Sequence, residues 1–193
     1  MPMLAQNKIA FKEWAVVCAA LGSGQQTIIL RKGGIDEGRE GFRVEHSEFW
    51  LLPTRFHQDP SQLTADAQPL WQQVQDAQSP PGKFLVNLYA VVEAVYELRD
   101  EAALDQLNGL HILSAETVRQ RFHYRHPGLF VLAVRTYHVP AAYEVADSPY
   151  IAGCKSWVEL PQALATAGVM PVLDEEAFAE QRKQLKVLVG GKG

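Results

Sequence analysis

The order of the predicted elements constrains the fold of this 193-residue chain more than any other feature. Apolar, β-branched runs that favour strands come first, and helical segments are inserted between later strands. The chain has no series of alternating strand and helix units that would build a doubly wound parallel sheet. We therefore predict an α+β fold: a mixed, mainly antiparallel, partly closed β-barrel of about seven strands, with short helices and a C-terminal helix.

The N-terminal strands are predicted from short apolar runs. Residues 15–21 and 27–30 read as two strands joined by a tight hairpin at 22–24. Two further strands are predicted at 42–46 and 49–52, with a bulge or bend between them because the alternation changes phase there. Pro53 is expected to end the ladder, since proline has no N–H to donate.

A longer alternating pattern predicts the central strands. Residues 84–98 place apolar side chains at every second position, which is typical of a long strand. Further strands are predicted at 129–139 and 156–160. Helices are predicted after Thr64, at 101–107, after the N-cap candidate Ser114, and at 174–189 with Asp174 as its cap.

Composition limits the class of protein. With 47% apolar and 21% charged residues, the chain suits a single domain over 1–193, with its core at about 8–178 and a loose tail at 190–193. It has no run of 18 apolar residues and no leader-like start, so we expect a cytoplasmic protein without a membrane partner. Cys18 and Cys154 are too few for a disulfide scaffold or a four-cysteine zinc site and suggest a reducing compartment.

Basic side chains are unevenly distributed although the formal net charge is −4. Residues 61–113 carry two basic and seven acidic side chains, whereas 117–143 contain no acid. The arginines of this acid-free block, which stand among histidines and aromatic residues, are Arg119, Arg121, Arg125 and Arg135. Guanidinium groups bind phosphate and rings stack on bases, so the pattern favours nucleic-acid binding. The alternative is that these side chains pair with the acidic segment 61–113.

A glycine-containing turn is a candidate anion site. It consists of Arg31, Lys32, Gly33 and Gly34. Glycine frees backbone N–H groups to face a phosphate, and the two cations would neutralise its charge. The alternative is a hairpin turn flanked by surface charge.

The segment around the predicted strand 49–52 supplies groups that can contact a base edge or a phosphate. They are Thr54, Arg55, His57 and Gln58. Trp50 and Trp157 are candidates for stacking, and Ser156 is adjacent to the second of them. These residues predict a base-sized pocket if the loop and the acid-free block share one rim of the molecule.

Catalytic alternatives rest on fewer residues. Glu13, Glu45 and Glu48 would have to converge near Lys32 for metal-dependent phosphodiester cleavage, yet no Asp/Glu-x-Lys tripeptide occurs. The favoured alternative is that Glu45 and Arg43 are cross-strand surface partners. Cys154 beside a lysine is a weaker candidate for a nucleophile, with a buried structural cysteine as the alternative. We predict no metal and no cofactor.

Four segments together resemble one bacterial family. They are residues 12–16, 30–35, 49–58 and 153–160, which contain Lys12-Glu13-Trp14, Arg31-Lys32-Gly33-Gly34, Trp50-Leu51-Leu52-Pro53 and Lys155-Ser156-Trp157. Over roughly residues 8–178 the chain resembles the domain-of-unknown-function family 1802. The resemblance implies no particular activity. Members joined to a restriction-endonuclease-type domain imply a DNA-defence setting and a restriction-type nuclease as a candidate partner.

The layout of residues 86–139 is similar to PUA-like modules such as the ASCH and EVE domains, which hold a nucleotide or modified base against aromatic rings. Fold alone does not fix function. We predict a non-enzymatic module that binds DNA or RNA, with Lys32, Arg55 and Arg135 on phosphate. The alternatives are a metal-dependent phosphodiesterase and a protein-interaction domain that uses segment 61–113. The sequence leaves the oligomeric state open.

Overall fold

The computed structural model describes residues 3–32, 45–77, 80–153 and 155–189, so Gly33, Gly34, Cys154 and the predicted tail 190–193 lie outside the described residues. The fold is α+β. The strands are β1 (Gln6–Trp14), β2 (Ile28–Arg31), β3 (Glu48–Thr54), β4 (Lys83–Leu98), β5 (Leu129–Ala146), β6 (Trp157–Ala165) and β7 (Met170–Pro171). The α-helices are α1 (Ala15–Gly22), α2 (Gln68–Asp76), α3 (Ala115–His123), α4 (Pro149–Ala152) and α5 (Glu175–Val189), and the 3-10 helices are η1 (Pro60–Gln62), η2 (Ala65–Ala67) and η3 (Glu101–Leu107).

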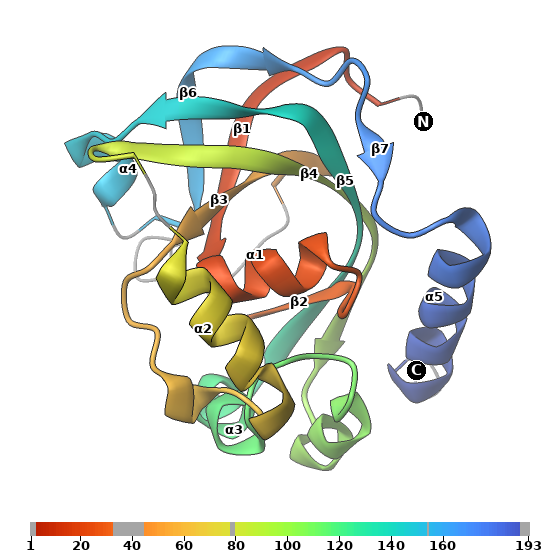
Figure 1. Ribbon diagram of the computed structural model, residues 1–193. Coiled ribbons are helices and arrows are strands. Elements are labelled where there is room, and N and C mark those ends of the chain that lie inside the picture. Colours follow the sequence, from red (N-terminus) through yellow and green to blue (C-terminus); the bar gives the residue numbers. More distant parts are fainter. Residues whose placement is uncertain (1–2, 33–44, 78–79, 154, 190–193) are drawn as a thin grey trace.

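All seven strands belong to one sheet with the order β2-β5-β4-β3-β1-β6, and β7 pairs with β5. β1 and β3 run parallel and the other described pairs are antiparallel, which confirms the mixed, mainly antiparallel sheet. Figure 1 shows β4 and β5 arching together over α1. The described strands β2 and β6 are not joined by a ladder, so the sheet is curved but is not closed into a barrel by strand pairing.

The prediction for the first forty residues is wrong in its central part. Residues 15–21 form helix α1 instead of a strand, and the strand that precedes it is β1. Nearly every side chain of α1 is buried, so its sequence lacks the one-sided apolar pattern that identifies a helix, and short apolar runs cannot be assigned from periodicity alone. The turn at 22–24 ends this helix, and β2 pairs with β5 rather than with residues 15–21.

The prediction around β3 is partly confirmed. β3 continues through Pro53 to Thr54, and Pro53 lies opposite Glu13 in the parallel register. Proline is tolerated there because β4 pairs with β3 only as far as Trp50, so no antiparallel neighbour requires an N–H at position 53. Of the strand predicted at 42–46, residues 42–44 lie outside the described residues, and residues 45 and 46 are not in a strand.

The long strands and the helix caps agree with the sequence. β4 and β5 pair along their whole lengths, and β5 extends well beyond the predicted 129–139. Ser114 accepts a hydrogen bond from the N–H of Thr117 at 3.2 Å, and Asp174 accepts one from Ala177 at 2.8 Å. Helices are therefore correctly placed where local cap chemistry defines their first turn.

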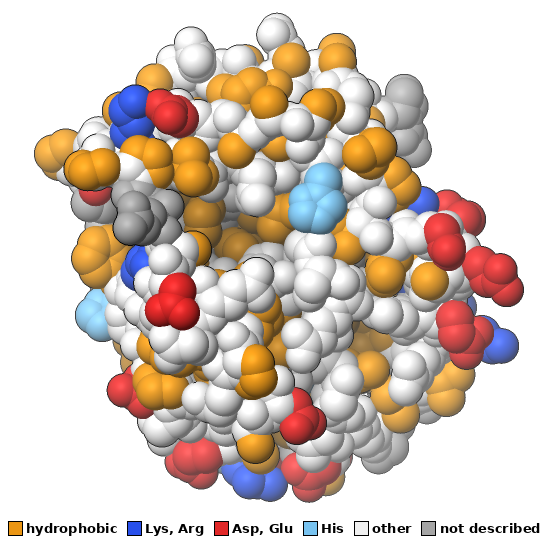
Figure 2. All heavy atoms as spheres, in the orientation of Figure 1, with side chains coloured by type: hydrophobic (Ala, Val, Ile, Leu, Met, Phe, Trp, Pro, Cys, Tyr) orange, Lys and Arg blue, Asp and Glu red, His pale blue; other side chains and the backbone are white. Residues whose placement is uncertain are grey.

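Apolar side chains pack on both faces of the curved sheet. Phe11 and Phe49 belong to a cluster with α1 and α3, whereas Trp50 and Tyr89 belong to a second cluster beneath β5 and β6. Figure 2 shows a hollow near the centre of one face, with hydrophobic side chains inside it. Within the described residues, no helix is both long and apolar enough to cross a membrane.

Candidate functional site

Arg31 connects the two edges of the sheet. It is the last residue of edge strand β2, and its Nη2 donates to Oγ of Ser156, which immediately precedes the opposite edge strand β6. Its guanidinium carbon lies 4.7 Å from the centre of the Phe11 ring, and Nη1 lies 3.7 Å from Oε2 of Glu13. One side chain therefore spans the seam that strand pairing leaves open.

Glu13 and Arg121 complete the polar cluster in this seam. The Glu13 side chain is only 1% exposed; its Oε1 accepts from the N–H of Trp14 at 2.7 Å, and its Oε2 lacks a hydrogen bond within the described chain. Arg121 stacks over the Trp14 ring at 4.5 Å and donates to the carbonyl of Leu30 at 2.9 Å. Burial lowers the pKa of Arg121, and the Glu13 carboxylate opposes that shift. Two guanidinium groups thus face one carboxylate.

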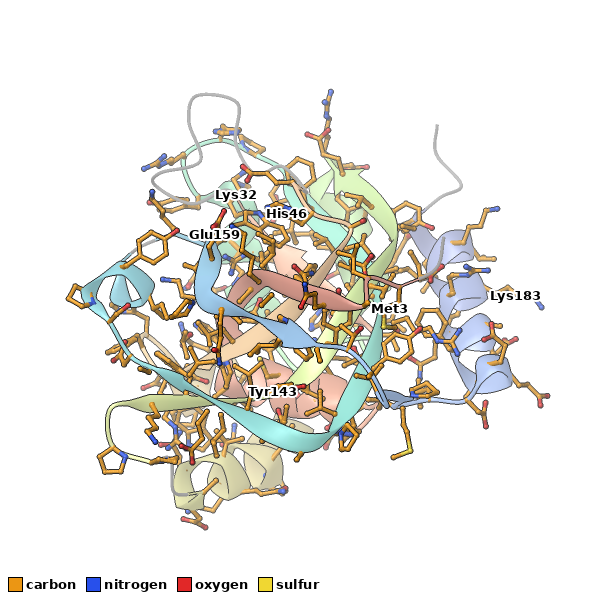
Figure 3. The ribbon with its side chains drawn as sticks, turned by 90° about the horizontal axis from the view of Figure 1, so that it is seen from above. Met3, Lys32, His46, Tyr143, Glu159 and Lys183 are labelled. Carbon is orange, nitrogen blue, oxygen red and sulfur yellow. The ribbon has the colours of Figure 1, made fainter. Side chains whose placement is uncertain are left out.

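Ser156 also lines a pocket of about 290 Å³. Its aromatic wall is Trp157, whose ring packs 4.6 Å from Phe11 and 5.0 Å from Phe49, between ring centres. The edge of the His46 ring meets Trp157 at 5.2 Å. Glu45, Tyr150, Lys155 and Glu159 also line the pocket. Figure 3 shows His46 and Glu159 on one side of the molecule, away from Lys183 on α5.

The structure brings six of the predicted residues together here. They are Glu13, Arg31, Glu45, Arg121, Ser156 and Trp157. Sequence reasoning missed His46, Tyr150 and Lys155 as pocket residues. Lys155 could have been identified, because it belongs to the same Lys155-Ser156-Trp157 segment. The sequence around Tyr150 did not indicate a pocket residue, because the position of Tyr150 follows from the packing of α4.

Lys32 lies near the seam but serves a different purpose. Its ammonium donates to the backbone carbonyls of Phe122 at 3.2 Å, of Gly128 at 2.8 Å and of His126. Burial lowers its pKa, while Glu97 acts in the opposite direction. Cations at a helix C-terminus stabilise the unpaired carbonyls there. Lys32 therefore caps the C-terminal end of α3, and these contacts do not support the prediction that it binds a phosphate.

Trp50 does not have the position that stacking requires. It is fully buried, its Nε1 donates to the carbonyl of Asn7 at 2.9 Å, and its ring lies against Tyr89 at 4.6 Å. β3 lies between β1 and β4 at this point and is covered on both faces. The prediction that Trp50 stacks on a ligand is therefore wrong.

The loop after β3 is tied to the body of the protein. Thr54 Oγ1 donates to the carbonyl of Glu13 at 3.1 Å, and Gln58 bonds both the carbonyl of Thr54 and the N–H of Val16 at the start of α1. Arg55 donates to the carbonyl of Ala77 at 2.7 Å, next to the end of α2. His57 is exposed and has a φ of 59°. This loop mainly anchors α1 and α2.

The acid-free block does not form a common rim. Arg121 points into the seam, Arg125 lies 5.3 Å over the exposed Tyr124 ring, and Arg135 pairs with Glu175 at the start of α5. Arg55 contacts Ala77 beside the end of α2, whereas Arg135 contacts the first residue of α5. Figure 1 shows these two helices apart, with α5 at the right of the molecule. On the face in Figure 2, blue side chains are scattered. The predicted shared rim is therefore wrong.

Two members of the block confirm the alternative of pairing with the acidic segment. Arg119 lies 3.1 Å from Oδ1 of Asp105, and His123 lies 3.0 Å from Oε2 of Glu101. All four side chains are partly exposed. Because Glu101 and Asp105 of η3 are paired in this way, the hypothesis that segment 61–113 serves as a free acidic docking surface is weakened.

The three glutamates proposed for metal-dependent cleavage do not converge. Glu48 begins β3, where its Oε2 accepts from Tyr89 Oη at 2.8 Å and from the N–H of Leu4 at 3.0 Å. Glu13 lies near the other end of the parallel β1–β3 pair, and Glu45 lines the pocket. Within the described ranges, no three histidine, cysteine, aspartate or glutamate residues are grouped to hold a metal.

The chain was compared with known proteins. A family model described as "Domain of unknown function (DUF1802)" matches residues 10–184. None of the curated proteins matches the chain. The crystal structure of ASCH from Zymomonas mobilis is 13% identical and has a TM-score of 0.42, covering 94% of each chain. A mutant of the same protein is 14% identical with a TM-score of 0.46, covering 97% of this chain and 99% of the other. These values do not identify a ligand or an activity.

Proposed function

The chain belongs to the DUF1802 family, and we propose that it is a non-enzymatic nucleic-acid-binding module whose Trp157 pocket accepts an unstacked base. The observation that carries the proposal is the meeting of Arg31, Ser156 and Trp157 at one seam, where a guanidinium group, a hydroxyl and an indole are neighbours. Nucleic-acid recognition combines such groups, since cations hold the backbone and rings hold the bases.

Trp157 is suited to be a stacking wall because its position is fixed. Phe11 and Phe49 brace the indole from the core, and His46 meets it edge-on. A ring held in this way loses little conformational entropy when a base packs on it. The pocket volume of about 290 Å³ lies at the small end of ligand sites, which span ~300–1,000 Å³. A single base suits it better than a larger ligand.

The seam provides the positive charge for a phosphate. Arg31 and Arg121 face the single carboxylate of Glu13, which leaves one positive charge in excess. At the pocket itself the exposed Lys155 is offset by Glu45 in the count of charges, and Glu159 is balanced by Lys8 at 2.6 Å, so the excess positive charge remains that of the seam. Such a modest excess suits one or two phosphate contacts.

A single strand is the ligand that this arrangement favours. A base in a duplex is covered on both faces, and extruding it costs a few kcal/mol. Each phosphate bound in a single strand contributes about −0.7 to the slope of log K against log salt, so one or two phosphate contacts should give a slope of about −0.7 to −1.4. A steep salt dependence would indicate a different, larger surface.

Fluorescence anisotropy with labelled 12-nucleotide single strands, the matching duplexes and strands carrying a methylated base tests the proposal at two salt concentrations. Stacking contributes ~1–3 kcal/mol per base when the whole ring is removed, and the smaller phenylalanine ring keeps part of it, so we expect Trp157→Phe to weaken single-strand binding about three- to tenfold. We expect Lys155→Ala to flatten the salt slope by about 0.7. Lys183→Ala, on α5, is the matched control and should bind like the natural protein.

Two results would refute the proposal: no binding of any oligonucleotide at low salt, or binding that Trp157→Phe and Lys155→Ala leave unchanged. Comparing the methylated strand with the unmodified strand tests the narrower hypothesis of a modified-base reader. Comparing a DNA strand with an RNA strand of the same sequence tests which of the two nucleic acids is bound. A restriction-type nuclease partner is a further hypothesis. Co-purification with a tagged nuclease of that class tests it separately.

A further inference from the structure

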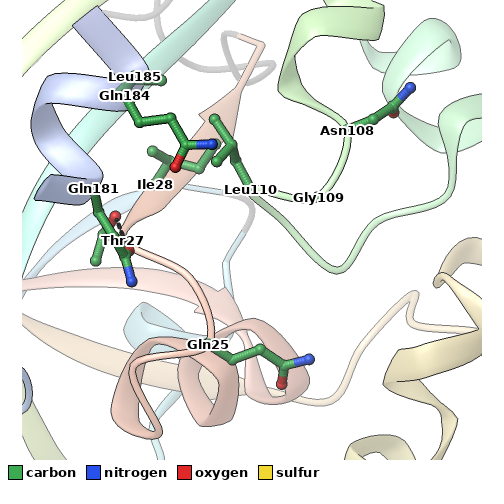
Figure 4. Close-up of a pocket in the computed structure, with 9 residues that line it drawn as sticks. All are labelled: Gln25, Thr27, Ile28, Asn108, Gly109, Leu110, Gln181, Gln184 and Leu185. Atoms are coloured by element: carbon green, nitrogen blue, oxygen red, sulfur yellow. Dashed lines mark hydrogen bonds between the residues drawn. The ribbon is translucent and has the colours of Figure 1, made fainter. Parts of the chain in front are cut away.

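A second pocket, of about 190 Å³, lies between the start of β2, the turn after η3 and helix α5. Figure 4 shows the side chains that line it. It shares no lining residue with the Trp157 pocket. Its walls therefore offer a site that the proposed function does not use.

The polar lining of this pocket is unusual because it is made of carboxamides. Gln25, Asn108, Gln181 and Gln184 contribute side-chain amides, Thr27 contributes a hydroxyl, and no charged side chain from the described part of the chain lines the pocket. Leu110, which is half-buried, is the apolar side chain of the lining that a ligand can reach, whereas Ile28 and Leu185 are almost fully buried in the core. A neutral lining with apolar support favours an uncharged ligand, since a buried ion would lack a partner of opposite charge.

The side-chain amides in and beside this pocket differ in whether they form hydrogen bonds within the protein. The neighbouring Gln26 is buried and has both ends bonded, to the carbonyl of Ile28 at 2.7 Å and to the N–H of Ile112 at 3.1 Å. Gln181 accepts from Thr27 Oγ1 at 2.9 Å, which fixes its orientation. The side chains of Gln25, Asn108 and Gln184 make no hydrogen bond among the described residues. Their donors and acceptors are thus available to a ligand.

We propose that this pocket binds a small, neutral, planar group that carries a hydrogen-bond donor and an acceptor side by side, as in a carboxamide or a free nucleobase. A carboxamide pairs with such an edge through two parallel hydrogen bonds, as asparagine and glutamine do with adenine. The flat face of the ligand would rest on Leu110. The inference does not depend on the Trp157 pocket.

Saturation-transfer NMR with nicotinamide and adenine tests this proposal, with nicotinate as the matched ligand in which a carboxylate replaces the carboxamide. We expect transfer to nicotinamide or adenine and much weaker transfer to nicotinate. Gln184→Leu and Asn108→Leu should each reduce the affinity about five- to tenfold, as expected for one lost hydrogen bond. Gln75→Leu replaces an exposed glutamine of α2 and should have no effect.

Circular dichroism shows whether each variant is folded, and side-chain amide shifts of Gln25 and Asn108 in the natural protein give a readout that needs no variant. The proposal is overturned if neither nicotinamide nor adenine receives saturation, if nicotinate binds equally well, or if both pocket variants bind as Gln75→Leu does. Shifts confined to the Trp157 side would also contradict it.

Discussion

Nη2 of Arg31 donates to Oγ of Ser156, a residue 125 positions later in the chain. The contact joins the two edges of a sheet that no ladder closes, and it holds the guanidinium group beside the buried Glu13 carboxylate. Arg31 therefore both holds the two edges of the sheet together and contributes to the positive charge at the proposed site.

Arg31→Met should destabilise the protein because it leaves Glu13 buried without its nearest cation. Removing one partner of a buried pair typically costs about 3–5 kcal/mol, and we expect about 2–4 kcal/mol here because Arg121 remains close. The double variant Arg31→Met/Glu13→Gln should recover part of that loss. Urea unfolding followed by circular dichroism measures both free energies.

The matched control for this variant is Arg99→Met. The Arg99 side chain is 79% exposed and pairs with Glu97 at the surface, where such pairs contribute ~0–1 kcal/mol. Equal losses for Arg31→Met and Arg99→Met, or no recovery in the double variant, would show that the seam is not stabilised by this charge pair.

His111 should make the protein less stable as the pH falls below 6.5. Burial lowers its pKa to about 4, so the unfolded chain takes up a proton that the folded chain does not between about pH 6.5 and 4. Stability is then full above pH 6.5 and falls by about 1.4 kcal/mol per pH unit, to a total of about 3 kcal/mol. Urea unfolding at pH 7, 6 and 5 measures the slope.

His111→Asn isolates this effect, because an amide oxygen can replace Nδ1 as acceptor for the N–H of Leu113. The difference between the natural protein and this variant should shrink or reverse from pH 7 to pH 5. His57→Asn, at an exposed position, serves as the control. Parallel pH profiles for the natural protein and His111→Asn would contradict the prediction.

The sequence was sufficient where the evidence is local. Residues 84–98 are rich in β-branched side chains and place apolar residues at alternate positions, and Ser114 and Asp174 carry their own cap chemistry, so β4, α3 and α5 could be located. It was insufficient for α1, whose apolar residues point in every direction because the helix is enclosed on all sides. Burial on all sides removes the pattern on which sequence prediction relies.

The candidate site was harder to predict because its contacts are between distant residues. The four arginines of the acid-free block are close in sequence, yet Arg121 faces Trp14 and Arg135 faces Phe178. A helix and a strand turn successive side chains in different directions, so a charge count cannot define a surface. The sequence singled out Ser156 and Trp157 as candidates, but their proximity to Arg31 follows only from the curvature of the sheet.

Cys18 should be unreactive in the folded protein. It is buried in α1, and burial, followed by the charge of Glu13, raises the pKa of its thiol well above the ordinary value. The thiolate is the reactive form, so a thiol-disulfide reagent should modify Cys18 only on unfolding. Because the folded thiol stays neutral, stability should decrease as the pH rises above about 9, where the unfolded thiol ionises.

A Cys154→Ser variant isolates the reaction of Cys18 with Ellman's reagent, in native buffer and in 6 M urea. The native rate should be lower by several orders of magnitude, and it should increase with urea in step with unfolding. Rapid modification of the folded protein would show that α1 opens readily or that its packing differs from that described.

Trp50→Phe and Trp157→Phe should have opposite consequences, although both replace a tryptophan in or beside the same sheet. Trp50→Phe removes the bond to the carbonyl of Asn7 and part of a fully buried ring, so we expect a loss of about 2–4 kcal/mol in unfolding free energy. Oligonucleotide affinity should stay unchanged at low temperature, where the variant remains folded.

Trp157→Phe keeps an aromatic ring against Phe11 and Phe49, so we expect it to lower the free energy of unfolding by less than about 1.5 kcal/mol and yet to weaken oligonucleotide binding. Measuring both quantities for both variants distinguishes a core tryptophan from a ligand-contacting one, and weaker binding by folded Trp50→Phe alone would place the ligand on the other side of the sheet.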